Sequence, residues 1–185
     1  MDIHELPKEA LFSLFLQIEP KEFKIVALSG NKKVREICNS EYFRETYKQK
    51  YRKVDFRYRK DLTEKDFQSL VGAYSVDLYG TNTTDDMLKY LTGVHTIVLR
   101  DTKVTDEGLK YLKGVHAIYL SRTKVTNKGM QYLKGVHTID LYSTQVTDEG
   151  MKYLSGVSSI DLGLTEVTYK GVNYLRSTGT KTIHK

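Results

Sequence analysis

The feature that most constrains this chain is a repeat with a constant period of 21 residues. Glycines mark the repeat most clearly, because copies aligned on them need no gap. These glycines are Gly72, Gly93, Gly114, Gly135 and Gly156. Self-similarity at a fixed period of about 20 to 50 residues is the signature of a stacked repeat protein. We therefore expect a solenoid, in which each repeat packs mainly against its neighbours.

Each repeat combines a strand pattern with a helix pattern. Ile97 and Leu99 lie two positions apart, as on a strand with one buried face. Leu109 and Leu112 lie three positions apart, as on a short helix. Strands joined by helical crossovers in one direction are parallel. The pattern predicts an α/β fold with a curved parallel sheet and helices on its convex side.

The helix of each repeat has signals for its start and its end. Thr105 stands where an N-cap is expected, and Asp106 and Glu107 follow it, where the helix dipole favours negative charge. Lys113 and Gly114 close the helix, because a cation suits the carbonyl end and glycine accepts left-handed backbone geometry. Local chemistry and the hydrophobic pattern thus predict the same element.

The strand half of the repeat resembles a known motif. Val94, Ile97, Leu99, Thr102 and Val104 spell V-x-x-I-x-L-x-x-T-x-V, which resembles the leucine-rich repeat consensus L-x-x-L-x-L-x-x-N-x-L. The resemblance covers residues 52–185 and implies a leucine-rich repeat solenoid of 21-residue repeats. Threonine replaces the consensus asparagine in every copy, and we expect its hydroxyl to satisfy backbone groups of the turn. These threonines are Thr81, Thr102, Thr123, Thr144 and Thr165.

Residues 1–50 lack the repeat and have a purely helical periodicity. Leu11, Leu14, Phe15 and Ile18 form one apolar stripe, and three or four short helices are expected. A helical unit of this size is marginal alone and usually packs on a partner or a second domain. We therefore predict two domains, a small helical domain at 1–50 and a repeat domain at 51–185.

The helical segment resembles the F-box. The usual opening, L-P-x-E, is matched by Leu6, Pro7 and Glu9, and the acidic-Pro pair before the second helix by Glu19 and Pro20. The resemblance is followed directly by the leucine-rich repeats. That order of domains is typical of the substrate receptors of cullin–RING ubiquitin ligases.

Three positions depart from the F-box pattern. Val34 and Phe43 stand where tryptophans are usual, and Ala10 is smaller than the usual isoleucine. The resemblance implies that the helical domain binds a Skp-type adaptor, while the repeats hold a target protein for ubiquitin transfer by other subunits. The residues expected to bind the adaptor are Leu6, Pro7, Glu9, Leu11, Phe15, Ile18, Phe23 and Val26.

The expected target-binding surface is the concave face of the sheet. Core positions barely change between repeats, whereas the outward positions of the strands vary in residue type. Varied side chains on a rigid curved surface suit protein binding, and Tyr and Arg dominate interface energetics. Drift of surface positions is the alternative explanation. The predicted target-binding residues are Val98, Arg100, Tyr119, Arg122, Asp140, Tyr142, Asp161 and Leu164.

No catalytic pattern is present in the sequence. It contains no nucleophile constellation, phosphate loop or metal motif, so we expect a non-enzyme without a cofactor. His95, His116 and His137 recur at the repeat spacing and would stack in a column about 5 Å apart. Duplication of the repeat explains this column better than a metal site, because no Cys or carboxylate shares its level. Cys38 lies in an apolar helical stripe, which favours burial over catalysis.

The charge of +6 lies mostly in residues 1–60, which hold 14 Lys and Arg against 9 Asp and Glu. Aromatic residues between these cations invite a nucleic-acid interpretation, but a solvated helix and a first strand explain them better. The longest apolar run, 11–18, is too short to span a bilayer, and a single cysteine fits a reducing compartment. We expect neither nucleic acid nor a membrane as partner.

The expected setting is therefore a monomer within a ligase complex, in the cytoplasm or nucleus of a eukaryotic cell. The cell itself, or an intracellular parasite or virus, would encode it. The rival interpretation is a non-ligase scaffold of leucine-rich repeats, whose helical head only caps the open end of the solenoid.

Overall fold

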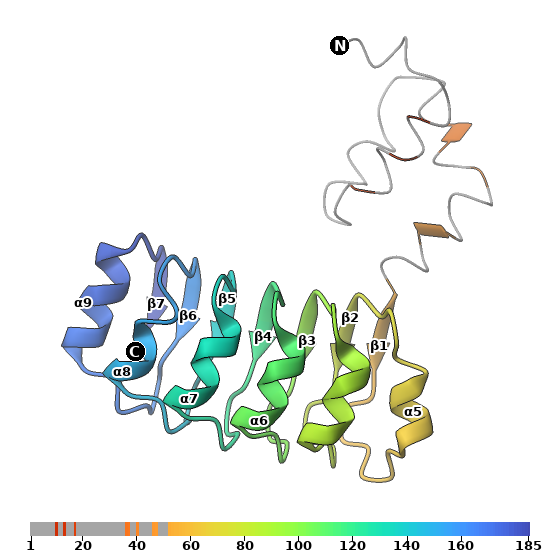
Figure 1. Cartoon of the computed structure of the whole chain (residues 1–185), viewed down its shortest axis with the longest axis horizontal. Helices are drawn as coiled ribbons and strands as arrows, with labels where there is room; N and C mark the ends of the chain where they lie inside the picture. Colours follow the sequence, from red (N-terminus) through yellow and green to blue (C-terminus); the bar gives the residue numbers. More distant parts are fainter. Residues whose placement is uncertain are drawn as a thin grey trace. The chain divides into compact units, whose positions relative to one another are not determined.

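The computed structural model describes residues 52–185 and, in addition, residues 10, 13, 17, 36, 37, 40, 46 and 47. The chain divides into two compact units, Met1–Arg52 and Lys53–Lys185, and the second of them holds the repeats (Figure 1). Among the described residues, no helix is both long enough and apolar enough to cross a membrane.

The repeat unit is built on one sheet of seven short parallel strands. Their spatial order is the same as their order along the chain, so each strand pairs with the strands of the preceding and the following repeat. The strands are β1 (Lys53–Asp55), β2 (Ser75–Asp77), β3 (Thr96–Val98), β4 (Ala117–Tyr119), β5 (Thr138–Asp140), β6 (Ser159–Asp161) and β7 (Thr182–His184).

A short helical segment connects each strand to the next. Two of these segments start as an α-helix and tighten into a 3-10 turn, and one is a 3-10 helix throughout, so the helix is less regular than the period alone predicts. The α-helices are α5 (Glu64–Gln68), α6 (Asp106–Leu109), α7 (Asn127–Met130), α8 (Asp148–Met151) and α9 (Tyr169–Ser177). The 3-10 helices are η1 (Asp85–Leu91), η2 (Lys110–Leu112) and η3 (Gln131–Leu133).

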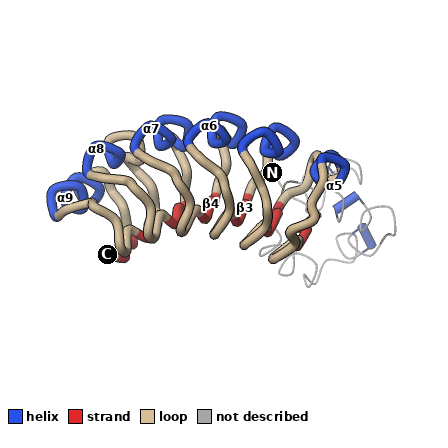
Figure 2. Tube along the Cα trace, turned by 90° about the horizontal axis from the view of Figure 1, so that it is seen from below, coloured by secondary structure: helices blue, strands red, loops and turns tan. Residues whose placement is uncertain are grey.

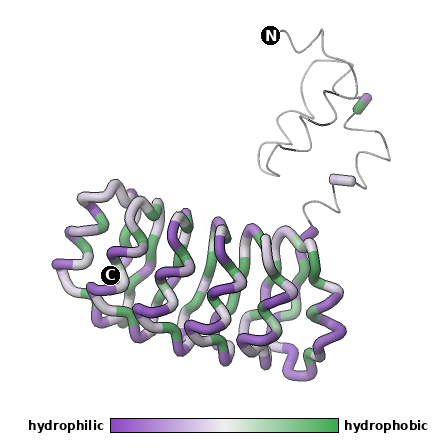
Figure 3. The backbone as a smooth tube through the Cα atoms, in the orientation of Figure 1, coloured by the Kyte–Doolittle hydropathy of each residue, from purple (hydrophilic) through white to green (hydrophobic). Residues whose placement is uncertain are grey.

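Strands and helices form two layers that bend together into an arc. Figure 2 shows the strands on the inner side of the arc and the helices on the outer side. The hydrophobic core fills the space between these layers, with Ile97, Leu99 and Leu109 completely buried. Each turn of the solenoid repeats the same succession of hydrophilic and hydrophobic segments (Figure 3). The predicted inward orientation of the strand Ile and Leu residues is confirmed.

Two local predictions about the turns are also confirmed. The Thr102 hydroxyl donates to the Leu99 carbonyl oxygen at 2.6 Å, and each of the other four threonines makes the same bond to a carbonyl three residues earlier. Gly114 has a φ of 81°, in the left-handed region that glycine accepts without a steric penalty. The threonine therefore closes the turn after the strand, where the consensus has asparagine, and the glycine closes the turn after the helix.

The register departs from the 21-residue period at both ends of the sheet. Internal strands keep that period, since Ile97 pairs with Ile118. Val54 pairs with Val76, so the first repeat is one residue longer. Ile160 pairs with Ile183, and the last repeat accommodates two further residues in its longer helix, α9.

Candidate functional site

The candidate site is the surface of the sheet on the inner side of the arc, which we call the inner face. Its side chains form three rows that run across the strands. The first row holds Asp77, Val98, Tyr119, Asp140 and Asp161, which pair in register from β2 to β6. The second row, just after the strands, holds Tyr79, Arg100, Ser121, Tyr142 and Gly163. The third row holds Gly80, Asp101, Arg122, Ser143 and Leu164.

A backbone ladder continues beyond the strands and holds the second row in place. The Gly80 N–H donates to the Arg100 carbonyl at 2.8 Å, and the Asp101 N–H donates to the Ser121 carbonyl at 3.0 Å. Equivalent bonds follow from Arg122 and Ser143. The side chains of this row therefore project from a hydrogen-bonded framework rather than from free loops.

The third row has an unusual backbone. Asp101, Arg122, Ser143 and Leu164 all have φ between 53° and 55°, in the left-handed region. Such a conformation costs a non-glycine residue about 1 to 2 kcal/mol. The equivalent residue of the preceding repeat is Gly80, which avoids this cost. The chain thus carries backbone strain at the row where side chains of four different types project, and Leu164 is 72% exposed there.

An ion pair across three strands forms the centre of the inner face. Arg100 Nη2 lies 2.6 Å from Asp140 Oδ2, and the Arg100 guanidinium carbon lies 5.0 Å from the centre of the Tyr119 ring. The Asp140 carboxylate is buried and also accepts from the Ser121 hydroxyl at 2.5 Å and from the Tyr142 N–H at 2.9 Å. A buried carboxylate is stable when it is paired and hydrogen-bonded, as it is here. These contacts lock Arg100 over Tyr119.

Two adjoining hollows lie beside this pair. The first has a volume of about 240 Å³ and is lined by Tyr79, Arg100, Asp101, Ser121, Arg122 and Tyr142. The second has a volume of about 370 Å³ and is lined by Arg57, Tyr58, Asp77, Tyr79, Val98, Arg100 and Tyr119. Tyr79 and Arg100 belong to both. Together they make a surface of tyrosine and arginine with scattered carboxylates, the composition that is enriched in protein interfaces.

Hydrogen bonds shift the pKa of two groups in or beside the second hollow. Arg57 Nη2 lies 2.6 Å from Asp55 Oδ2, and this hydrogen bond holds the pKa of Asp55 below its usual value. A hydrogen bond with Tyr58 raises the pKa of Tyr79, and their ring centres lie 4.8 Å apart. Tyr79 is therefore a neutral hydroxyl at physiological pH, suited to hydrogen bonding with a partner.

The predicted target-binding residues all lie on the inner face. Arg100, Arg122 and Tyr142 line the first hollow. Val98 and Tyr119 line the second, and Asp140 pairs with Arg100. Asp161 and Leu164 lie further along, on β6 and the turn that follows it. Asp140 is buried and has little surface for a partner to contact. Its role is to hold the Arg100 guanidinium in position.

Four residues of the second hollow were not predicted from the sequence. They are Arg57, Tyr58, Asp77 and Tyr79. The longer first repeat hides Arg57 and Tyr58, because a strict 21-residue alignment places them one position out of register. The Val-Asp pair that both β1 and β2 contain, Val54-Asp55 and Val76-Asp77, is the signal that restores the register.

The histidines form the predicted column. The rings of His95, His116 and His137 are stacked with centres 4.5 Å apart, and Tyr74 continues the stack at 4.4 Å from His95. Nδ1 of His137 lies 3.2 Å from the Thr138 hydroxyl. Within the described part of the chain, no group of three His, Cys, Asp or Glu side chains is arranged to hold a metal ion. The column is a stack of rings at the residues just before strands β3, β4 and β5.

The residues predicted to bind an adaptor lie outside the described residues. This holds for Leu6, Pro7, Glu9, Leu11, Phe15, Ile18, Phe23 and Val26. Cys38 lies outside them as well.

Comparison with known proteins supports the fold of the repeats. No protein-family model matches the chain, and no curated protein matches it. Among solved structures, an internalin from Listeria monocytogenes, a leucine-rich repeat protein, is similar with a TM-score of 0.53 and 13% sequence identity. The repeat unit is a leucine-rich repeat solenoid. The likeness covers 78% of this chain and 50% of the internalin chain, so this chain spans about half the length of that structure.

The leucine-rich repeat unit differs from the consensus in the hydrogen bonds that hold its turns and join its repeats. The Thr102 hydroxyl donates within its own turn, and the Thr81 and Thr165 hydroxyls also accept from the N–H two residues later. The bonds between repeats come instead from carboxylates at the start of the helices.

Proposed function

We propose that this chain is the substrate-recognition subunit of an SCF-type ubiquitin ligase. In this proposal residues 1–50 bind a Skp-type adaptor, and the inner face binds a target protein. The F-box-like residues Leu6, Pro7 and Glu9, directly before leucine-rich repeats, support the first half of the proposal. The chain itself performs no chemistry, because ubiquitin transfer belongs to other subunits. Its place of action is the cytoplasm or nucleus of a eukaryotic cell.

The observation that carries the target-binding half is the anchored cluster around Arg100. Asp140 and Tyr119 hold the guanidinium in one place, so little side-chain freedom is lost when a partner binds. Arg122 and Leu164 project nearby from strained backbone and differ from the residues at the same positions in other repeats. A rigid frame with varied exposed contacts favours recognition of one particular protein.

The adaptor half is tested by co-purification of the full chain with a purified Skp-type adaptor. Replacing Leu6 and Pro7 with Ala should abolish the complex, while circular dichroism and the thermal melt of the repeats stay unchanged. The matched control is Leu164→Ser, an exposed leucine on the inner face, which should leave adaptor binding intact. If the unaltered chain shows no adaptor binding at concentrations of about 10 to 100 µM, the ligase proposal fails.

The target half is tested by proximity labelling in eukaryotic cells that express the full chain. Proteins captured by the unaltered chain and lost with the Arg122→Ser and Leu164→Ser variants would be inner-face partners. Serine suits this backbone, because Ser143 already has the same left-handed conformation. A capture pattern that is identical for all variants would contradict binding at the inner face. Target capture without adaptor binding would support the interaction scaffold whose head only caps the solenoid.

A further inference from the structure

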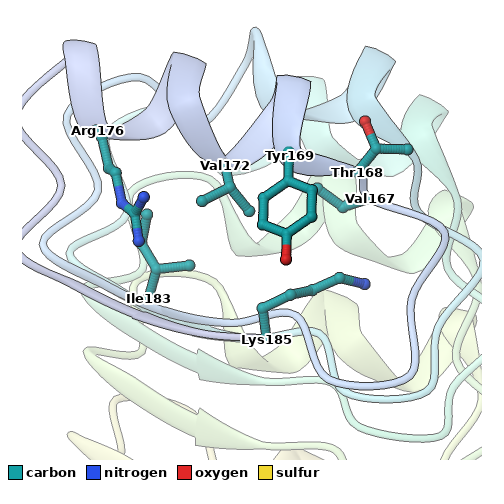
Figure 4. Close-up of a pocket in the computed structure, with 7 residues that line it drawn as sticks. All are labelled: Val167, Thr168, Tyr169, Val172, Arg176, Ile183 and Lys185. Carbon is teal, nitrogen blue, oxygen red and sulfur yellow. The ribbon is translucent and has the colours of Figure 1, made fainter.

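An apolar cleft lies beside β7 in the repeat that contains α9. The cleft has a volume of about 350 Å³ and lies between α9 and β7. Figure 4 shows Val172 and Ile183 on its two sides, with the Tyr169 ring between α9 and the Lys185 side chain and Arg176 at the far end. The lining residues are Val167, Thr168, Tyr169, Val172, Arg176, Ile183 and Lys185.

Internal repeats show what normally covers such a face. Ile139 and Ile160 are completely or almost completely buried, because the following repeat adds a strand beside each of them. Ile183 occupies the same position on β7 but is only half-buried. Tyr169 is 86% exposed beside it. The occupant that fits this geometry is an extended segment, parallel to β7, with an aliphatic side chain at the central position.

The edge of β7 offers backbone groups for the same occupant. Among the described strands, β7 pairs only with β6 and is the last strand of the sheet. In the preceding repeat, the His137 carbonyl accepts from the N–H groups of both Ser158 and Ser159. Lys181 holds the equivalent position before β7. An exposed edge strand of this kind accepts an added strand through main-chain hydrogen bonds.

The charge around the cleft specifies the chemistry of the occupant. Residues 166–185 contain 4 Lys and Arg against 1 acidic residue, a net charge of +3, whereas residues 61–165 contain 11 against 13, a net charge of −2. Lys185 Nζ donates to the Thr165 carbonyl at 2.8 Å, and within the described residues neither Arg176 nor Lys185 forms an ion pair. A carboxylate on the occupant would therefore find uncompensated cations at both ends of the cleft.

We propose that the α9–β7 end binds an extended, acidic segment of a partner protein as an eighth parallel strand. One aliphatic side chain of that segment fills the space between Val172 and Ile183, and carboxylates on either side of it face Arg176 and Lys185. A second copy of this chain fits less well, because two ends of charge +3 would meet. The proposal is independent of adaptor binding and of the inner face.

The test uses the full chain labelled with ¹⁵N and a synthetic peptide as the probe. The peptide Asp-Ser-Ser-Ile-Asp-Leu-Asp keeps the strand sequence of residues 158–162 between two acidic ends. Chemical shifts should move for the amides of Thr182–Lys185 and α9, with a dissociation constant of about 1 mM or tighter. Two control peptides, one with Lys for every Asp and one with the Ile and the following Asp exchanged, should bind at least about threefold more weakly.

Variants of the chain separate the proposed contacts from non-specific attraction. Arg176→Gln and Lys185→Gln should each weaken peptide binding by about two- to fivefold. Lys134→Gln, an exposed lysine outside the cleft, is the matched control and should leave binding unchanged. Tyr169 is too exposed to support the fold, so Tyr169→Ser should weaken binding without changing the thermal melt.

Three outcomes would overturn the proposal. The first is an absence of shifts at Thr182–Lys185 in the presence of several millimolar acidic peptide. The second is equal binding of the acidic and lysine peptides. The third is sedimentation of the chain as a dimer that dissociates in the Tyr169→Ser variant, because a second copy would then be the occupant.

Discussion

The Asp106 carboxylate holds Thr126 of the next repeat at two points. Its Oδ2 accepts from the Thr126 hydroxyl at 2.6 Å, and its Oδ1 accepts from the Thr126 N–H at 2.7 Å. The same clamp joins Asp85 to Thr105 and Asp148 to Thr168. The helices α6, α7, α8 and α9 therefore each start at a threonine that is fixed by the preceding helix, and these repeats are joined on the helix side as well as through the sheet.

We predict that Asp106→Ala lowers the free energy of unfolding by about 1 to 3 kcal/mol, because a half-buried N–H and a hydroxyl lose their acceptor. Asp106→Asn should lose much less. Asn127 already performs this role, accepting from the Thr147 N–H and donating to its hydroxyl, both at 2.9 Å. Urea denaturation of the two variants measures the difference. Equal losses for Ala and Asn would show that the two hydrogen bonds are not responsible.

The clamp also explains a second set of glycines. A Cβ added to Gly108 would lie 2.5 Å from Asp85 Oδ1 and 2.8 Å from Leu88 Cδ1, and the equivalent glycines of the later repeats are equally crowded. Alanine gains about 1 kcal/mol over glycine within a helix. Overpacking of this kind costs about 1 to 3 kcal/mol. We expect the second effect to dominate, because the carboxylate is held by two bonds and cannot move aside.

Gly108→Ala should therefore lower the melting temperature, although it improves helix propensity. Lys110→Ala, at an exposed position just after the same helix, is the control and should have little effect. A Gly108→Ala variant with an unchanged or higher melting temperature would mean that Asp85 adjusts without cost.

Most of the fold could be predicted from the sequence, because positions that are buried in every repeat carry apolar residues at the same spacing. The inward Ile97 and Leu99, the turn threonines and the left-handed Gly114 each follow from a local rule applied at one spacing. The clamp between Asp106 and Thr126 could not be predicted, because its two partners belong to different repeats. A sequence period shows which positions are equivalent, but it does not show which residues they contact. Gly108 recurs at the same period, but its spatial reason lies in the neighbouring repeat.

The candidate site was predictable in its location but not in its internal contacts. Alternation along the strands places Arg100, Tyr119 and Asp140 on the inner face. Nothing in the alternation shows that Arg100 reaches past β4 to Asp140 on β5, because that contact depends on the rotamer of a long side chain. The left-handed backbone at Leu164 was equally hidden, since only Gly80, in the repeat before the predicted set, carries the usual signal for it.

The layered core predicts a large effect for Leu120→Ala. Leu120 is completely buried between β4 and the helices, so the substitution opens a cavity and should cost about 2 to 5 kcal/mol. Val71→Ala, at a position that is 62% exposed, is the control and should cost less than about 0.5 kcal/mol. Denaturant unfolding gives both values. A small loss for Leu120→Ala would contradict tight packing between the strand and helix layers.

The clamp at Asp148 predicts a defined dependence of stability on pH. The Thr168 hydroxyl, which donates to Asp148 at 2.6 Å, is the main cause that lowers the pKa of Asp148 below its ordinary value of 3.8. A carboxylate whose pKa is lower in the folded state stabilises the protein above its unfolded-state pKa, and loses that contribution as the pH falls through the folded-state pKa. Asp148→Asn keeps the clamp geometry but cannot titrate. The free energy of unfolding of the unaltered chain, minus that of Asp148→Asn, should therefore decrease from about pH 5 downwards.

The reciprocal substitution, Asn127→Asp, sharpens this test. It places a titrating group where Asn127 now donates to Thr147, so the Thr147 hydroxyl must become the donor, as Thr126 and Thr168 are. The variant should match the unaltered chain near neutral pH and become relatively less stable in acid. Urea denaturation at neutral pH and at about pH 3 measures both differences. If neither substitution changes the acid dependence, the carboxylate clamps contribute no charge-dependent stability, and the helix side of the solenoid is joined by packing alone.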